Sequence, residues 1–448
     1  MANTIHTTSK QQNLIHAISK QDNSHHAVFP VTSPLSTPLA PNSIRIRTTL
    51  IFLSSNNLTY ACLGDALGWW STYPMPPSPI APPPYNDSSA WGIVPAWGYA
   101  TVEASTIDAL PAGTELYGYW PTTSTATDLQ LVPAPDGAAG HWVETSPHRQ
   151  GLMRMYNRYI EQPIARGKDC NDVAAARVLA LRTAFKPLWE CGYLNSRYVY
   201  PDPSSSTITA PPVHPFGVPG LPWTAQDADL RKAVAVSLSA TSKTGRGFAW
   251  SLLRDRAPGS GPLALLQATS APGVVKTFAE GEGDDGTPPN KAVGYEELGG
   301  AAGVGWVLGF RPEKVVVFDF GTRPGVLEGF LEALKKEKGG EAVQVSVVAV
   351  GHEMKVYSEA DMKAGMESME KFQKVQFNTS PVRDRAIEIE GGDAYFAKMN
   401  EAWKRCEEEG GLGEFETVWL DGVEGIEKVW QDLCEQKVKP SETVIVRV

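Results

Sequence analysis

The chain has 448 residues, a formal net charge of −10, 42% apolar residues and 20% charged residues. This length and composition predict a folded protein of two domains with a large apolar core. The negative balance, without any block of lysine and arginine, argues against a nucleic-acid groove, which needs clustered positive charge. The first residues lack the apolar core of a secretory signal, and no apolar run approaches the roughly 20 residues that span a bilayer.

The cysteines argue against a disulfide framework and against a zinc site. The five of them are scattered and never spaced as Cys-x-x-Cys. A thiolate zinc site or a set of disulfides needs closer grouping. Cys62, His141 and His148 also lack the spacing of metal ligands. We therefore expect reduced thiols, a cytoplasmic location and no bound metal.

The first third of the chain predicts mainly β-structure. Residues 1–42 are polar and rich in serine, proline and histidine, which indicates a partly ordered arm. Residues 43–155 are expected to form a β-rich domain, because short alternating or β-branched runs are separated by proline and glycine turns. The expected strands are 44–53, 97–105, 114–120 and 129–134. The proline-rich stretch 74–89 is predicted to be a surface loop.

A change to helical periodicity begins near residue 150. Apolar residues three and four apart predict helices over 151–162 and 172–194. Strands and helices then alternate: strand 233–240, helix 244–255, strand 263–270, a helix through 274–278, weak strand 291–295, strand 314–320, helix 323–339 and strand 343–351. This alternation predicts a parallel, doubly wound sheet, so residues 156–376 are expected to form a Rossmann-like dinucleotide-binding domain.

The C-terminal segment, residues 377–448, is expected to return to the first domain. Amphipathic patterns predict helices over 392–409 and 423–436. The last residues, 442–448, are β-branched and predict a strand that follows the closed parallel sheet.

The main candidate for chemistry is the segment 237–250, where a buried strand turns into a helix. Dinucleotide pyrophosphates dock at such turns, because small residues let the backbone approach the phosphates and a helix N-terminus faces them. Here small residues stand where the usual fingerprint has glycines. The expected cofactor-binding residues are Ser239, Ala240, Thr241, Ser242, Lys243, Thr244 and Gly245. The same turn also suits a helix cap in an inert α/β domain.

The end of the next strand bears on the choice of cofactor. An acidic residue there would bind the ribose hydroxyl of NAD. Thr269 and Ser270 stand there instead, and their hydroxyls can accommodate a 2′-phosphate. We therefore expect NADP(H), although no arginine stands beside them in the sequence.

Two further strand ends are candidate ligand contacts. Asp319 and Gly321 follow one central strand, and Gly351 and His352 follow the next. Ligands bind at the carboxyl ends of parallel strands, so these residues are expected to line the cofactor. Asp319 equally suits a helix cap, and a lone histidine is more often structural. The glycine run 299–305 looks like a phosphate loop, but no buried apolar strand precedes it, so we predict a loop insertion.

Eight short segments, in this order along the chain, resemble a fungal and bacterial family known as domain-of-unknown-function family 2855. They are residues 56–60, 63–65, 91–98, 116–119, 146–149, 156–159, 242–244 and 318–321. The resemblance extends from about Asn13 to Val448, with two departures, the proline-rich stretch 74–89 and a glycine-rich stretch near 299–311. The family is itself similar to the zinc-free quinone and enoyl reductases of the medium-chain dehydrogenase/reductase superfamily. This kinship implies a GroES-like β-domain and a Rossmann domain.

The resemblance also implies a function. Zinc-free members of that superfamily use NADPH to reduce an activated double bond or a quinone, so it implies a reductase of an α,β-unsaturated carbonyl compound or a quinone, in fungal secondary metabolism. In such reductases the segment matching 55–64 lies near the nicotinamide, which points to Asn57, Thr59 and Tyr60 for substrate polarisation or proton donation. Tyr60 packed in the core of the β-domain is an equally open interpretation.

The expected partner is a small-molecule substrate, with no nucleic acid and no membrane, and a homodimer is left open. One alternative from another class also stays open. The chain would then be a non-catalytic binding or scaffold protein, which kept the fold while its phosphate loop lost the glycines.

Overall fold

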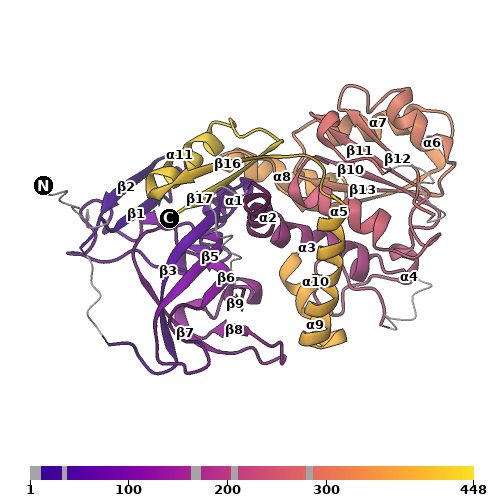
Figure 1. Ribbon diagram of the computed structural model, residues 1–448. Coiled ribbons are helices and arrows are strands. Elements are labelled where there is room, and N and C mark those ends of the chain that lie inside the picture. The colour runs from indigo at the N-terminus through magenta and orange to yellow at the C-terminus, as the bar shows by residue number, and fades with distance from the viewer. Residues whose placement is uncertain (1–11, 33–37, 163–172, 203–209, 279–285) are drawn as a thin grey trace, which may run out of the picture.

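The computed structural model describes residues 12–32, 38–162, 173–202, 210–278 and 286–448. Its β-rich part is a sheet of eight strands in the order β16-β17-β3-β5-β6-β9-β8-β7. In Figure 1 the strands from β3 to β9 are indigo to magenta, and β16 and β17 are yellow. An additional pairing of β3 with β7 closes six of these strands into a barrel. The barrel strands are β3 (Ser43–Phe52), β5 (Ala96–Ser105), β6 (Glu115–Trp120), β7 (Thr127–Pro133), β8 (His141–Glu144) and β9 (Arg158–Glu161).

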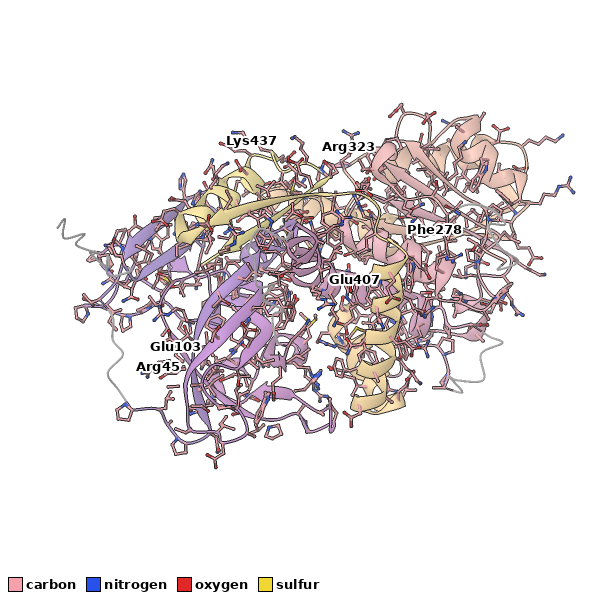
Figure 2. The ribbon with its side chains drawn as sticks, in the orientation of Figure 1. Arg45, Glu103, Phe278, Arg323, Glu407 and Lys437 are labelled. Atoms are coloured by element: carbon pink, nitrogen blue, oxygen red, sulfur yellow. The ribbon has the colours of Figure 1, made fainter. Side chains whose placement is uncertain are left out.

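Alternation along β3 shows why this segment forms a barrel wall. Ile44 and Ile46 are buried in the core, whereas Arg45 and Arg47 point outward. Arg47 pairs with Glu103 of β5 at 2.5 Å. Figure 2 shows Arg45 and Glu103 on the outer side of the barrel. The hydrophobic pattern thus fixes which face of β3 lines the core.

The second part is a parallel sheet of six strands in the order β12-β11-β10-β13-β14-β15. Its strands are β10 (Ala233–Leu238), β11 (Ala264–Thr269), β12 (Asn290–Gly294), β13 (Lys314–Phe320), β14 (Gln344–Gly351) and β15 (Val375–Gln376). Counted along the chain this is the order 3-2-1-4-5-6 of the doubly wound dinucleotide-binding fold. The predicted α/β class, a β-barrel domain with a Rossmann sheet, is confirmed.

Helices cover both faces of this parallel sheet, as its apolar strands require. In β13, Val315 and Val317 pack toward α6 (Trp306–Gly309) and α7 (Val326–Lys336). Val316 and Phe318 face the opposite side, which carries α3 (Lys186–Leu194), α5 (Lys243–Arg254) and α10 (Gly392–Glu408). The core on that side is continuous with the core of the barrel.

Two glycines allow α3 and α5 to cross in close contact. A Cβ atom on Gly192 would lie 2.3 Å from the backbone nitrogen of Phe248, and one on Gly247 would lie 2.8 Å from Cα of Trp189. Side chains at either position would push the helices apart. The packing therefore holds α3 against the helix that begins at the predicted phosphate loop.

The C-terminal segment returns to the barrel, in yellow in Figure 1. Strand β17 (Glu442–Arg447) pairs antiparallel with β3 and parallel with β16 (Glu416–Asp421). Helix α11 (Gly422–Cys434) connects β16 to β17. The predicted final strand and both predicted C-terminal helices are present. No helix in the described ranges is long and apolar enough to cross a membrane.

Three local predictions are wrong. Residues 151–162 form a short 3-10 turn and strand β9, because Tyr159 turns inward and β9 completes the barrel between β6 and β8. Residues 274–278 contain only the end of a 3-10 turn. The glycine run 299–305 includes a helical turn that leads into α6. The described part of the predicted arm is ordered as a hairpin of β1 (Leu14–Ser19) and β2 (His26–Pro30), in which the four consecutive residues 15–18 of β1 are buried.

Candidate functional site

The predicted phosphate loop lies where the strand order of the parallel sheet reverses. Strands β10 and β13 are neighbours there, and their connections leave toward opposite ends of the sheet. The turn after β10 begins with Ser239, whose φ of +59° lies in the region that favours glycine. Ser242 then caps α5, its hydroxyl accepting from the N–H of Gly245 at 3.0 Å. The strand-turn-helix geometry of a dinucleotide site is therefore present, built with serine in place of glycine.

Lys243 is a cation at the positive end of α5. Its Nζ lies 5.3 Å from the ring centre of Phe185, and it forms no ion pair with any residue of the described ranges. Burial, with the nearby charge of Arg246, lowers the pKa of Lys243 to about 8. A helix N-terminus already favours negative charge, so an unpaired lysine there creates a strong local preference for an anion.

Arg246, one turn further, ties the loop to the C-terminal segment. Its Nε donates to the carbonyl of Thr241 at 3.0 Å, and Nη1 donates to the carbonyls of Leu412 and Glu414 at 2.9 and 2.8 Å. Nη2 donates to Pro440 at 3.3 Å. This guanidinium is 4% exposed, and burial lowers its pKa to about 10. Arg246 therefore fixes the backbone of the loop by hydrogen bonds to carbonyl groups.

Hydroxyl groups connect the loop to the ends of the neighbouring strands. Thr241 and Thr269 share a hydrogen bond at 2.8 Å, and Ser239 shares one with Tyr295, just after β12, at 3.1 Å. The guanidinium carbon of Arg323, from the turn after β13, lies 5.0 Å from the ring centre of Tyr295. Arg323 is exposed (Figure 2). No arginine stands beside Thr269 in the sequence, but Arg323 comes to the same edge of the sheet from the turn after β13.

The predicted residues after β13 and β14 contact one another. Asp319 accepts from the N–H groups of Gly321 and Thr322 at 3.2 and 2.9 Å and pairs with Lys374 at 3.3 Å. Gly321 has a φ of +97°, and a Cβ there would lie 2.2 Å from the carbonyl oxygen of His352. The carboxylate of Asp319 is thus occupied in shaping its own turn. Helix α7 has a different cap, Gly325, so Asp319 does not cap that helix.

The three predicted catalytic residues lie on α1 (Ser55–Cys62) in the barrel domain. Asn57 is 3% exposed; its side-chain oxygen accepts from Ser54 N–H at 2.8 Å, and its amide donates to Pro95 at 3.0 Å. Tyr60 is also buried, and its hydroxyl accepts from Nε1 of Trp97 at 3.2 Å. Burial raises the pKa of Tyr60. Asn57 thus caps its helix and Tyr60 packs in an aromatic core, which leaves the half-buried Thr59 as the accessible member of the three.

Helix α1 lies at the boundary between the two parts of the molecule. Sγ of Cys62 lies 3.6 Å from Sδ of Met362 in α8 (Glu359–Lys371), which follows β14. The amide of Asn378 similarly contacts Met153 at 3.5 Å. The C-terminal end of α1 therefore contacts the helix that follows β14. In the described ranges no three His, Cys, Asp or Glu side chains are grouped as metal ligands.

The comparisons with known proteins give a family match and several distant structures. The sequence profile of the family described as "Protein of unknown function (DUF2855)" matches residues 52–439. No curated protein matches the chain. Similar solved structures include CurA from Vibrio vulnificus in complex with NADPH, at 10% identity and a TM-score of 0.45, with 97% of this chain and 99% of CurA covered.

Two further solved structures have the same degree of similarity. The mycobacterial protein Rv1454c complexed with NADPH has 10% identity and a TM-score of 0.46, with 97% of this chain and 100% of that chain covered. The JamJ enoyl reductase in its apo form has 9% identity and a TM-score of 0.48, with 97% and 99% covered.

Sequence reasoning missed three residues that shape this edge: Tyr295, Arg323 and Arg246. Tyr295 could have been found from the sequence, because it stands at the end of the weak strand predicted over 291–295, which forms β12. Arg323 and Arg246 had no local signal, since their partners lie on segments remote in the sequence.

Proposed function

The chain belongs to the family described as "Protein of unknown function (DUF2855)", and from this premise we propose that it is an NADPH-dependent reductase of an activated carbon–carbon double bond or of a quinone. The observation that carries the proposal is the unpaired Lys243 at the first turn of α5, at the point where the strand order reverses. Pyrophosphate is the ligand that this position accepts in doubly wound sheets.

The residues at this edge fit the parts of NADPH. The N-terminus of α5 and Lys243 would hold the pyrophosphate. Thr269 and Ser270, which have no acidic residue directly beside them in the sequence, would leave room for a 2′-phosphate, and the exposed Arg323 would meet it. The bound cofactor would supply a hydride to the substrate.

The chain itself would position the substrate and control a proton. Thr59 is the half-buried member of the three predicted residues, and its hydroxyl would donate a hydrogen bond to the substrate carbonyl. Asn57 and Tyr60 would keep α1 in place through their internal hydrogen bonds. Each of these assignments can be tested separately.

The reductase activity is tested by following NADPH oxidation with a panel of quinones and α,β-unsaturated aldehydes. We expect turnover with at least one of the two classes. Thr59→Val should lower kcat about tenfold or more, because it removes one hydrogen-bond donor at the reacting carbonyl. Ser55→Ala, on the same helix, should leave the rate unchanged. Tight NADPH binding without turnover on any member of the panel would contradict the reductase proposal.

One observation favours a second candidate, a non-catalytic binding or scaffold protein. Two of the three predicted catalytic side chains, Asn57 and Tyr60, make internal contacts. Such a protein would have kept the fold and lost the chemistry. A chain that neither binds NADPH nor oxidises it would support this second function.

A further inference from the structure

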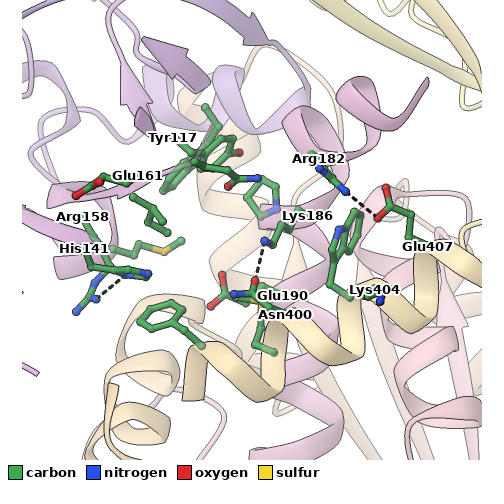
Figure 3. A pocket seen from close by; sticks show the side chains of 18 of the residues that line it. Tyr117, His141, Arg158, Glu161, Arg182, Lys186, Glu190, Asn400, Lys404 and Glu407 are labelled. Atoms are coloured by element: carbon green, nitrogen blue, oxygen red, sulfur yellow. Dashed lines mark hydrogen bonds and ion pairs between the residues drawn. The ribbon is translucent and has the colours of Figure 1, made fainter. Parts of the chain in front are cut away.

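A cavity of about 560 Å³ lies between the barrel and the helices α3, α9 (Thr379–Glu390) and α10 (Figure 3). It has the size of pockets that bind small organic molecules. None of the residues predicted to bind the cofactor or to act in catalysis lines it. The proposed reductase function therefore assigns no role to this cavity, although Trp97 of its lining donates to the hydroxyl of Tyr60 at 3.2 Å.

Much of the cavity wall is aromatic or apolar. Trp97 and Tyr117 of the barrel lie stacked, with ring centres 6.1 Å apart and an angle of 14° between the ring planes. Phe396, Met399 and Trp403 of α10 contribute from the opposite side. These side chains suit a ligand with a flat or elongated apolar body.

The polar part of the lining is almost completely paired. It includes five lysine and arginine side chains, Arg158, Arg182, Lys186, Arg383 and Lys404. Four of them have acidic partners: Arg383 with Glu190 at 2.9 Å, Arg182 with Glu407 at 3.6 Å, Lys404 with Glu408 at 3.7 Å, and Arg158 with Asp136. His141 accepts a hydrogen bond from Arg158 on Nδ1, and burial lowers its pKa to about 3, so it is neutral.

Lys186 is the exception. Its Nζ donates to Oδ1 of Asn400 at 2.8 Å, and no carboxylate of the described ranges lies within 4.0 Å of it. Figure 3 shows the lysine directed from α3 toward Asn400 on α10, across the cavity. Burial lowers the pKa of Lys186 to about 8, and the more distant carboxylates of Glu190 and Glu407 act in the opposite direction.

We propose that this cavity binds a small amphipathic monocarboxylate, with its carboxylate on Lys186 and its apolar body against Trp97 and Tyr117. Lys186, which has no ion-pair partner in the described ranges, would pair with the single negative charge of the ligand's carboxylate. The amide of Asn400, whose oxygen faces Lys186, has N–H groups that can donate to the same carboxylate. The proposal goes beyond the reductase function, because the site and its ligand are independent of the cofactor edge.

The test uses 2-naphthoate and its neutral analogue 2-naphthamide as probes in calorimetric titrations of the full chain. We expect 2-naphthoate to bind at least tenfold more tightly than 2-naphthamide, because only the carboxylate forms a charge-assisted contact with Lys186. Lys186→Met should weaken naphthoate binding tenfold or more. Lys404→Met removes a lysine of the same lining that already has a partner, and it should change the affinity less than twofold.

A second variant keeps Lys186 and gives it an internal carboxylate partner in place of the ligand. Asn400→Asp places a carboxylate beside Lys186 at an exposed position, so it should fold normally and lose naphthoate binding. Saturating NADPH should leave the naphthoate affinity unchanged. Equal binding of the acid and the amide, unchanged binding by both variants, or displacement of naphthoate by NADPH would each overturn the proposal.

Discussion

The hydroxyl oxygens of Thr241 and Thr269 lie 2.8 Å apart, and this contact joins the turn after β10 to the end of β11. Both side chains are buried, so the loop and the strand end form one rigid edge. Ser270, the next residue, is exposed at that edge. Its side chain is thus the one at the end of β11 that can meet a bound cofactor.

Ser270→Asp should therefore reverse the preference for NADPH. A carboxylate at this position would repel a 2′-phosphate and accept a hydrogen bond from a free ribose hydroxyl. We expect NADPH affinity to fall tenfold or more and NADH affinity to stay equal or rise, as measured by calorimetry. Ser270→Ala, which adds no charge, should retain the wild-type ratio. An unchanged ratio in Ser270→Asp would show that the 2′-phosphate is bound elsewhere.

Arg246→Met should destabilise the fold and disturb the predicted phosphate loop. The substitution removes the donor to the carbonyl groups of Thr241 and Leu412, which are buried, and to that of the exposed Glu414. Each orphaned buried carbonyl costs about 1–3 kcal/mol, partly offset because a buried charge is removed, so we expect a loss of ~2–4 kcal/mol in the free energy of unfolding. Urea denaturation would measure it. Lys243, one turn earlier, donates no such bonds, so the free energy of unfolding of Lys243→Met should equal that of the wild type.

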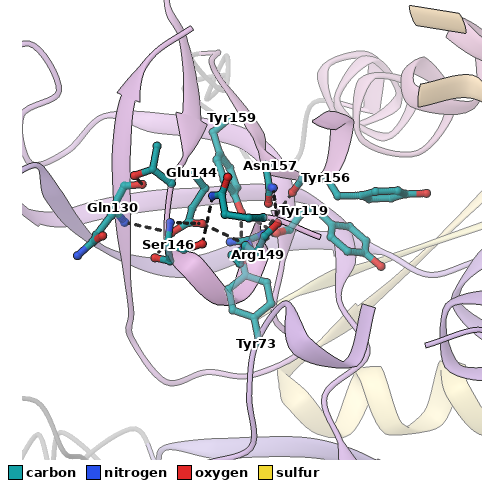
Figure 4. A network of polar contacts seen from close by, with 11 residues as sticks. Tyr73, Tyr119, Gln130, Glu144, Ser146, Arg149, Tyr156, Asn157 and Tyr159 are labelled. Carbon is teal, nitrogen blue, oxygen red and sulfur yellow. Dashed lines mark hydrogen bonds and ion pairs between the residues drawn. The ribbon is translucent and has the colours of Figure 1, made fainter. Parts of the chain in front are cut away.

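The buried pair of Glu144 and Arg149 predicts a large effect inside the barrel (Figure 4). The two charged groups lie 3.7 Å apart and are each 1% exposed. Arg149 also donates to the carbonyl of Tyr156 at 3.2 Å. Arg149→Met should cost about 3–5 kcal/mol of stability, because it leaves a buried carboxylate without its partner.

Two controls test the cost assigned to this buried pair. One adds a substitution at Glu144, and the other breaks an ion pair at the surface. Arg149→Met combined with Glu144→Gln should recover part of the loss, because no unpaired charge remains. Lys363→Ala breaks the ion pair between Lys363 and Glu367, whose side chains are 76% and 68% exposed. It should lower the free energy of unfolding by less than about 1 kcal/mol. Equal costs for Arg149→Met and Lys363→Ala would contradict this account of the barrel core.

Two buried histidines predict how stability depends on pH. Burial lowers the pKa of His16 and of His141 from 6.5 to about 3. The unfolded chain therefore binds protons that the folded chain rejects, so stability is complete above pH 6.5 and falls as the pH decreases toward 3. Each histidine should lower the free energy of unfolding by about 2 kcal/mol as the pH falls from 6.5 to 5. His16→Gln and His141→Gln should each reduce this slope in denaturation measured between pH 7 and 5, and a slope unaffected by either would contradict the assignment.

The Rossmann sheet could be predicted from sequence because its signals are local. Runs such as 233–236 and 315–318 are continuously apolar, and the helices between them have clear periodicity. The barrel was harder. Residues 151–162 have helical spacing, yet β9 forms there because Tyr159 completes the barrel wall, and this pairing with β6 and β8 is set by tertiary structure.

The sites show the same division between local and remote information. The candidate phosphate loop could be proposed from the sequence because all of its residues lie within one strand-turn-helix unit. Arg323 and Tyr295 come together only because separate strands end at one edge of the sheet. Lys186 and Asn400 are 214 residues apart and meet only when α10 packs beside α3. No local pattern could have predicted either contact.

The most direct test of the central claim is a calorimetric titration of NADPH into the wild type and Lys243→Ala. We expect the wild type to bind NADPH and the variant to bind at least tenfold more weakly, because a charge-assisted contact to phosphate contributes about 1.5–3 kcal/mol. Unfolding without ligand should be the same for both proteins, since Lys243 has no internal ion pair in the described ranges. Equal NADPH affinity in the two proteins, or no binding to the wild type, would contradict the proposal that the turn after β10 holds the cofactor.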